Sequence, residues 1–278
     1  MSKKKPTSEQ PKKEPRRTTP TFLLELPLAL HAGQAKRIRG HLEGGRAFYN
    51  AMLSEGQSRL RRMRADPAWR AARAIPRTEM QERRAAFSAL RERHGFSEYA
   101  FHELAKGLRV GWIAEHLDAV LAQTLASRAY HTLNRVCVGK AKRVRFRSRG
   151  RGLSSIENKR TDTGMRFVLE PPEEGNRGWL IWKEDQLPVV IEWDDEVVAH
   201  GLRQRIKYAR LVQRRASSEH AAGADRQGYR YFVQLACEGV PHHKQKHLVG
   251  QDIIGADLGP IFHRLGPAGR GSQPRGLL

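Results

Sequence analysis

The sequence predicts an α+β protein in which a small β-barrel is interrupted by an inserted helical segment. Three observations predict this fold. A short apolar run at residues 22–30 predicts a strand. Across about 34–137, apolar residues recur at every third or fourth position, which is the helical period. From 153 onward, short β-branched and aromatic runs alternate with proline and glycine turns, which is typical of small barrels.

The composition indicates a polyanionic partner. The 278 residues include 51 Lys+Arg and 29 Asp+Glu, which gives a net charge of +22. Such a surplus opposes compaction unless a polyanion is nearby, and nucleic acid is the leading interpretation. A solvated charged surface is the alternative. No apolar run approaches the ~20 residues of a spanning helix, and no signal-peptide pattern follows the charged N-terminus. We therefore expect no membrane partner and a cytoplasmic location.

The N-terminal residues predict a tail followed by an edge strand. Residues 1–20 contain Lys, Arg, Pro, Ser and Thr without any aromatic residue, so we expect a disordered basic tail. In the strand that follows, Pro27 cannot donate a ladder hydrogen bond. It therefore places this strand at a sheet edge or a bulge.

The helical segment, residues 34–137, is expected to contain several helices. The Asp66-Pro67 pair ends the first of them. The pattern at 78–81 resembles a capping box, and Ser97 could cap the helix after it. The expected helices start at Gln34, near 79, at Glu98 and, for one last long helix, at Trp112. Their apolar stripes are best explained as core, while arginines fall mostly off the stripes.

The most basic stretch of the chain is 139–152. Val144 and Phe146 alternate with arginines, which predicts a short strand with one apolar and one cationic face. Phosphate contact is the functional interpretation, and an exposed charged strand is the alternative. The candidate nucleic-acid-binding residues are Lys140, Lys142, Arg143, Arg145, Arg147, Arg149 and Arg151, together with Arg203 and Lys207.

The remaining strands are expected at 166–169, 179–182, 189–193 and 229–237, while 202–215 fits a strand or a short helix leading into one. Cys137 and Cys237 are interpreted as small hydrophobes, because their number and spacing suit neither a disulfide framework nor zinc. The histidines at 242, 243 and 247 are better explained as loop residues than as metal ligands.

A carboxylate near the C-terminus is the candidate catalytic residue. Asp257 follows the strand-like pair Ile253-Ile254 and lies within the segment Gly255–Pro260. A carboxylate at a strand end, next to a glycine turn, can be held rigidly as an oxygen ligand for Mg²⁺. An aspartate that forms an ordinary turn is the alternative interpretation.

Taken in order, these features resemble the TnpB (OrfB) proteins of bacterial insertion sequences, which are RNA-guided nucleases related to type V CRISPR effectors. The resemblance rests on the early strand, on Ala47–Asn50, on the basic segment Gly139–Phe146, on Ser154–Lys159, on the strand Tyr229–Leu235, and on Gly255–Pro260. The last of these is similar to the first RuvC motif.

The resemblance implies a wedge-like β-barrel (21–33 with 138–246), a helical recognition lobe (34–137), and the start of an RNase H-like RuvC domain (247–278). It implies guide RNA and double-stranded DNA as partners, and cleavage by two Mg²⁺ ions on three carboxylates. Of these carboxylates, Asp257 alone has a counterpart here.

Residues 264–276 are rich in Gly, Pro and Arg and do not resemble the second RuvC strand. We therefore expect a RuvC domain truncated after its first strand, without the family's zinc ribbon, and a chain that does not cleave DNA by itself. A non-catalytic RNA- or DNA-binding module, such as a repressor remnant of a transposition protein, is the alternative function. A weaker alternative is an unstable fragment.

Overall fold

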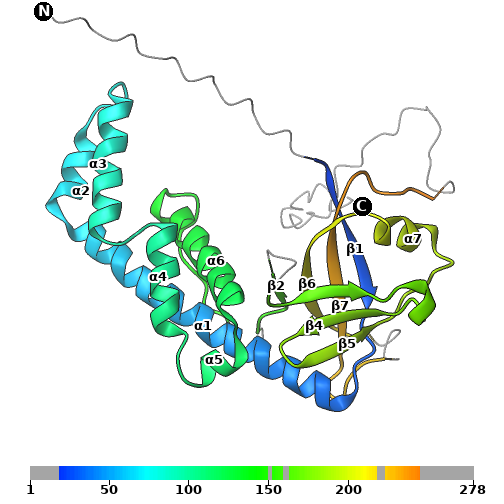
Figure 1. The fold of residues 1–278 in the computed structure, drawn as a ribbon. Coiled ribbons are helices and arrows are strands. Elements are labelled where there is room, and N and C mark those ends of the chain that lie inside the picture. Colours follow the sequence, from blue (N-terminus) through cyan, green and yellow to red (C-terminus); the bar gives the residue numbers. More distant parts are fainter. Residues whose placement is uncertain (1–18, 150–151, 159–162, 218–222, 245–278) are drawn as a thin grey trace, which may run out of the picture. The chain divides into compact units, whose positions relative to one another are not determined.

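A single 34-residue helix contacts both the other helices and the sheets (Figure 1). The computed structural model describes residues 19–149, 152–158, 163–217 and 223–244. The fold is mixed α+β with antiparallel sheets, as expected. The described residues up to His242 form one compact unit. In the described residues no helix has the length and apolarity needed to cross a membrane.

The helices largely follow the expected order. They are α1 (Ala32–Ala65), α2 (Pro67–Ala74), α3 (Met80–Arg93), α4 (Glu98–Leu108), α5 (Trp112–His116), α6 (Ala119–Cys137) and α7 (Glu196–Leu202), with a short 3-10 turn at Pro172–Glu174. Asp66 ends α1 and caps α2, since its Oδ1 accepts a hydrogen bond from the Ala68 amide at 2.9 Å. Ser97 caps α4 as expected.

Two helical predictions are wrong. The pattern at 78–81 forms no capping box, because Glu79 at the start of α3 makes no side-chain cap bond. The long helix expected from Trp112 is divided into α5 and α6. Asp118 starts α6 anew, with its Oδ1 accepting from the Leu121 amide at 2.8 Å. A residue that caps the start of a helix has an extended backbone, so the preceding helix cannot continue through it.

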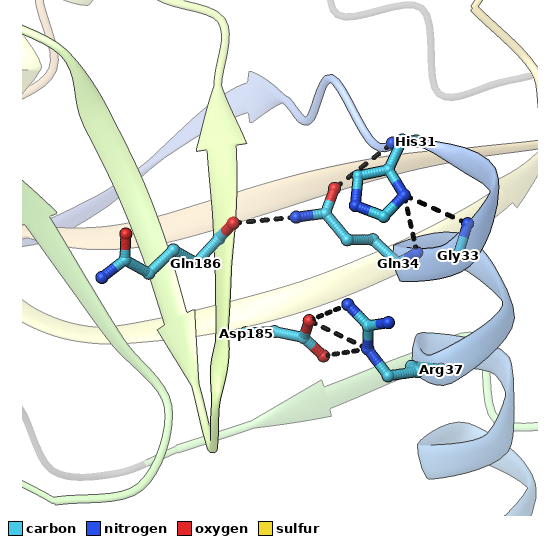
Figure 2. Close-up of polar contacts among 6 residues, drawn as sticks. All are labelled: His31, Gly33, Gln34, Arg37, Asp185 and Gln186. Carbon is cyan, nitrogen blue, oxygen red and sulfur yellow. Dashed lines mark hydrogen bonds and ion pairs between the residues drawn. The ribbon is translucent and has the colours of Figure 1, made fainter.

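The capping box of the structure lies at the start of α1 (Figure 2). His31 Nδ1 accepts from the amides of Gly33 and Gln34 at 3.1 and 3.3 Å, and Gln34 Oε1 accepts from the His31 amide at 3.2 Å. Histidine is outside the usual capping set of Ser, Thr, Asp and Asn. The reciprocal bond from Gln34 follows the capping-box pattern.

The strands form two antiparallel sheets. One has the order β1-β7-β6-β2 and the other β3-β4-β5. Their bounds are β1 Thr21–Pro27, β2 Ser155–Glu157, β3 Arg166–Leu169, β4 Gly178–Trp182, β5 Asp185–Val189, β6 Ile206–Arg215 and β7 Tyr229–Glu238. β1 is an edge strand, as Pro27 predicts. The ambiguous segment 202–215 becomes the end of α7 followed by β6.

Neither sheet closes on itself among the described residues, so these strands do not form the expected closed barrel. The sheets are joined where Leu28 bridges Val189, with the Val190 amide donating to the Pro27 carbonyl at 2.8 Å. β2 and β3 each end their own sheet and do not pair with each other. A barrel requires a continuous ladder around its circumference.

The strand expected at 189–193 instead occupies 185–189. Lys183 has a positive φ of 54° and forms the tight turn between β4 and β5. Pro188 lies inside β5 and faces Trp179 of β4. β5 is the last strand of its sheet, and its outer side makes only the short bridge to residues 28–29, where the Pro188 carbonyl accepts from the Ala29 amide at 2.9 Å. A proline is tolerated in such a strand. The sequence predicts a strand that begins after Pro188 because proline usually marks a turn, whereas here Pro188 lies within the strand.

The core of the helical part depends on close approach to α1. A Cβ on Gly56 would lie 2.3 Å from Leu133 Cδ1 of α6 and 2.6 Å from Phe101 Cζ of α4. Leu133 and Phe101 are both fully buried, as is Met52 one turn earlier on α1. Gly56 therefore lets three helices meet at one point, which any larger side chain would prevent.

The first turns of α1 dock onto the β4–β5 hairpin (Figure 2). The Arg37 guanidinium donates in a bidentate manner to the Asp185 carboxylate, with Nε 3.0 and 2.9 Å from the two oxygens. Gln34 Nε2 donates to the Gln186 carbonyl at 2.9 Å. Asp185 is only 8% exposed, but the Arg37 side chain is 52% exposed, so water reaches this ion pair from the arginine side and its value is mainly to orient the helix.

His41, one turn further along α1, is a buried histidine at the same junction. It is 8% exposed, its ring lies 4.6 Å from that of Trp182, and its Nδ1 is 3.2 Å from His116 Nδ1. Burial, followed by the nearby Lys183 and His116, lowers the pKa of His41 to about 4. The negative charge of Asp185 raises the pKa of His41, whereas the positive charge of Arg37 lowers it further.

The stability of the protein should therefore depend on pH through His41. Between pH ~6.5 and about 4, the unfolded chain binds a proton at His41 that the folded chain does not. Stability from this group is complete above pH ~6.5 and is lost as the pH falls. In urea unfolding at pH 7.5 and 5.0, we expect His41→Gln to reduce the pH-dependent loss by about 1–2 kcal/mol. An identical loss in both proteins would contradict this assignment.

Candidate nucleic-acid interface

The basic segment 139–149 is fixed by its backbone rather than by a sheet. The side chain of Asn50 on α1 pairs with Arg147 in both directions. The Arg147 amide donates to Asn50 Oδ1 at 2.9 Å, and Asn50 Nδ2 donates to the Arg147 carbonyl at 2.8 Å. Arg46 Nη1 donates to the same carbonyl at 2.9 Å. The amide side chain thus replaces the partner strand that a β-ladder would supply.

The strand expected over this segment is not formed. Residues 140–149 have no regular secondary structure. Of the two residues assigned to one apolar face, Val144 is 8% exposed whereas Phe146 is 48% exposed. The alternation of side chains requires a strand held by neighbours, and Asn50 fixes the backbone at a single residue instead. Phe146 is left as an exposed aromatic ring among cations.

We call the six exposed cations of this segment the basic strip: Lys140, Lys142, Arg143, Arg145, Arg147 and Arg149. None of their side chains forms a hydrogen bond or an ion pair with any residue that the structure describes. Some arginines elsewhere do have partners: Arg46 Nη2 lies 2.7 Å from Glu43 Oε1 and lowers the pKa of that carboxyl. Arg149 also lowers the pKa of Glu43, but no strip cation forms an ion pair with a described carboxylate. Most of the charge of the strip is therefore uncompensated among the described residues, which favours binding of a polyanion.

Two further candidates lie apart from the strip in the fold. Arg203 is exposed and caps the C-terminus of α7. Lys207 lies on β6, with its Nζ 3.4 Å from Glu238 Oε1 and 3.1 Å from Thr21 Oγ1. Since Lys207 already has an acidic partner, it is a weaker candidate than the strip residues.

Several predicted residues fall outside the described part of the chain, namely Arg151, His247 and Asp257. Among the described residues, no group of three side chains suited to metal ligation occurs. His242 contacts Glu196, with Nε2 3.2 Å from Oε2. Of the two free cysteines, Cys237 is fully buried, and burial raises the pKa of its thiol to about 11.

Sequence reasoning missed two kinds of residue at this interface. Asn50 belongs to the stretch Ala47–Asn50 that carries part of the TnpB resemblance, but no local pattern around it indicates a positioning role. The arginines between 70 and 84 were also not selected. The close succession of arginines over residues 70–84, without a matching number of acidic residues, is the sequence pattern that would have indicated them.

The comparisons with known proteins supply no family assignment. The sequence matches no protein-family model, and no curated protein matches it. The functional argument therefore depends on the geometry above.

Loss of the Asn50 clamp should release the strip without unfolding the protein. In Asn50→Ala, we expect hydrogen exchange of the Arg147 amide to accelerate about fivefold, because a hydrogen bond contributes about 1 kcal/mol. Ser58→Ala is the matched control, since Ser58 lies on the same helix and its hydroxyl bonds only locally, to the Ser54 carbonyl and the Arg61 guanidinium. Equal exchange in Asn50→Ala and the wild type would refute the clamp.

Proposed function

We propose that this protein binds nucleic acid as a TnpB-type protein, holding guide RNA and target DNA. The observation that carries the proposal is the basic strip: six exposed cations without partners among the described residues, on a backbone that Asn50 and Arg46 fix to α1. A fixed array of cations loses less conformational freedom on binding than a loose tail does. Release of counterions from the nucleic acid then favours the complex.

The architecture fits this proposal at a coarse level. We propose that the two joined sheets correspond to the wedge-like barrel of the family and that α1 to α6 correspond to its recognition lobe. The strip follows α6 directly and is clamped to α1, so it lies where these two parts of the chain meet. The start of the RuvC domain is proposed for 247–278, with Asp257 as an inherited Mg²⁺ ligand.

Charge reversal in the strip should weaken binding to any nucleic acid. For Arg143→Glu/Arg145→Glu/Arg147→Glu, we expect at least a tenfold higher Kd for a structured RNA and for a 20-bp DNA duplex, because several phosphate contacts are lost. Fluorescence anisotropy at 100 mM salt measures the Kd for the RNA and for the duplex. The backbone clamp uses only the main chain of Arg147, so the fold should persist.

The matched control has the same change of charge at exposed arginines elsewhere: Arg61→Glu/Arg166→Glu/Arg226→Glu. We expect this control to change Kd by no more than about threefold, as a long-range effect of net charge. Equal weakening by both triple variants would mean that net charge, and not the strip, determines binding.

A binding module without cleavage activity is the second candidate function. It is favoured because the proposed binding surface, the basic strip, does not involve Asp257. Target DNA, guide RNA and Mg²⁺ distinguish the two functions. With all three present, DNA binding that requires a matching guide RNA would establish the TnpB-type function, whereas equal binding of matched and unmatched DNA would establish the module. Neither function predicts cutting by this chain.

A further inference from the structure

A second cationic surface lies on the helical part, in a groove lined by α2, α3 and the ends of α1 and α6. Its volume is about 1130 Å³. Seven arginines line it, and none of the described lining residues is acidic. Pockets for single small molecules are about 300–1,000 Å³, so the groove suits a segment of a larger ligand. Its rim includes Val138 and Gly139, which directly precede the basic strip.

Some of the lining arginines maintain the helices. Arg83 Nη1 donates to the carbonyls of Arg73 and Ile75, at 2.9 and 2.5 Å, and so joins α3 to α2. Arg91 Nη2 donates to Asn134 Oδ1 of α6 at 2.9 Å. These contacts explain why Arg83 and Arg91 are present without any ligand.

Four other arginines have no such explanation. Arg70, Arg73, Arg77 and Arg84 are exposed, and their guanidinium groups form no hydrogen bond or ion pair with any described residue. They surround a common groove, so their mutual repulsion is not relieved by neighbouring carboxylates. An anionic ligand with several charges would relieve it.

The groove also has an apolar side that phosphate contact alone would not use. Trp69 and Phe87 are half-buried and pack edge to face, with ring centroids 5.1 Å apart. Met80 and Val138 are 55% and 51% exposed. A duplex presents mainly phosphates and sugars, whereas unpaired nucleotides also present flat apolar bases. Stacking of bases on aromatic side chains is the usual way in which proteins bind single strands.

We propose that this groove binds unpaired nucleotides of RNA, with phosphates on the four free arginines and a base against Trp69 and Phe87. The proposal rests on the proposed function and deepens it. The groove would be specific for single strands, whereas the basic strip would bind the phosphates of both single-stranded and duplex nucleic acid. Since the groove ends at Gly139, one RNA can continue from the groove onto the strip.

The test compares two probes, a 12-nucleotide oligo(U) RNA and a 20-bp DNA duplex, on the full chain. For Arg73→Glu/Arg77→Glu/Arg84→Glu we expect at least a tenfold higher Kd for oligo(U) and no more than about a threefold change for the duplex. The slope of log K against log salt for oligo(U) should become shallower by about 2, from three contacts at about 0.7 each.

Tryptophan fluorescence reports the stacked base directly. We expect oligo(U) to quench the wild type, and most of this quenching to be absent in Trp69→Phe, which keeps an aromatic ring. The glutamine triple variant at positions 73, 77 and 84 repeats the test with milder changes if the charge reversal lowers Tm. The triple control at Arg61, Arg166 and Arg226 corrects for net charge.

Three outcomes would overturn the groove assignment: equal loss of oligo(U) and duplex binding, unchanged quenching in Trp69→Phe, or equally tight binding of a 12-residue poly-glutamate. The last would make the groove a general polyanion or acidic-peptide site. The proposed function is tested separately. It would fail if charge reversal at Arg143, Arg145 and Arg147 left duplex binding unchanged, whatever the result for the groove.

Discussion

The docking of α1 onto the β4–β5 hairpin is the constraint on which the rest of the structure depends. Arg37 and Gln34 fix the first turns of the helix to Asp185 and Gln186. A helix of 34 residues extends for about 50 Å, so a contact at one end determines the positions of groups far along it. The clamp residue Asn50 is positioned by this one element, as is the start of α2.

Charge is distributed in two distinct ways along this frame. Where elements meet, cations have acidic partners, as in Arg37 with Asp185 and Arg210 with Glu157. On the basic strip and in the groove lined by α2 and α3, arginines lack acidic partners among the described residues. Partnered charges stabilise the fold only modestly. Unpartnered ones of one sign oppose compaction until a polyanion binds, so their positions indicate where the ligand lies.

Local signals in the sequence predicted the parts of the fold that local chemistry determines. The break at Asp66-Pro67 and the edge position of Pro27 follow from the missing amide of proline, and Ser97 caps its helix as expected. Features that depend on distant partners could not be predicted. The strip is held by Asn50, about 100 positions away, instead of by a sheet. Pro188 fits a strand because β5 ends its sheet and has only a short bridge to residues 28–29 on its outer side.

The central claim, that this surplus of unpartnered cations binds nucleic acid, is tested most directly by the salt dependence of affinity. Duplex binding by the full chain is measured between 50 and 300 mM KCl. If the strip neutralises four to six phosphates, log K should fall linearly with log salt, with a slope of about −4 to −5. A slope near zero, or no measurable binding at 50 mM, would contradict the account.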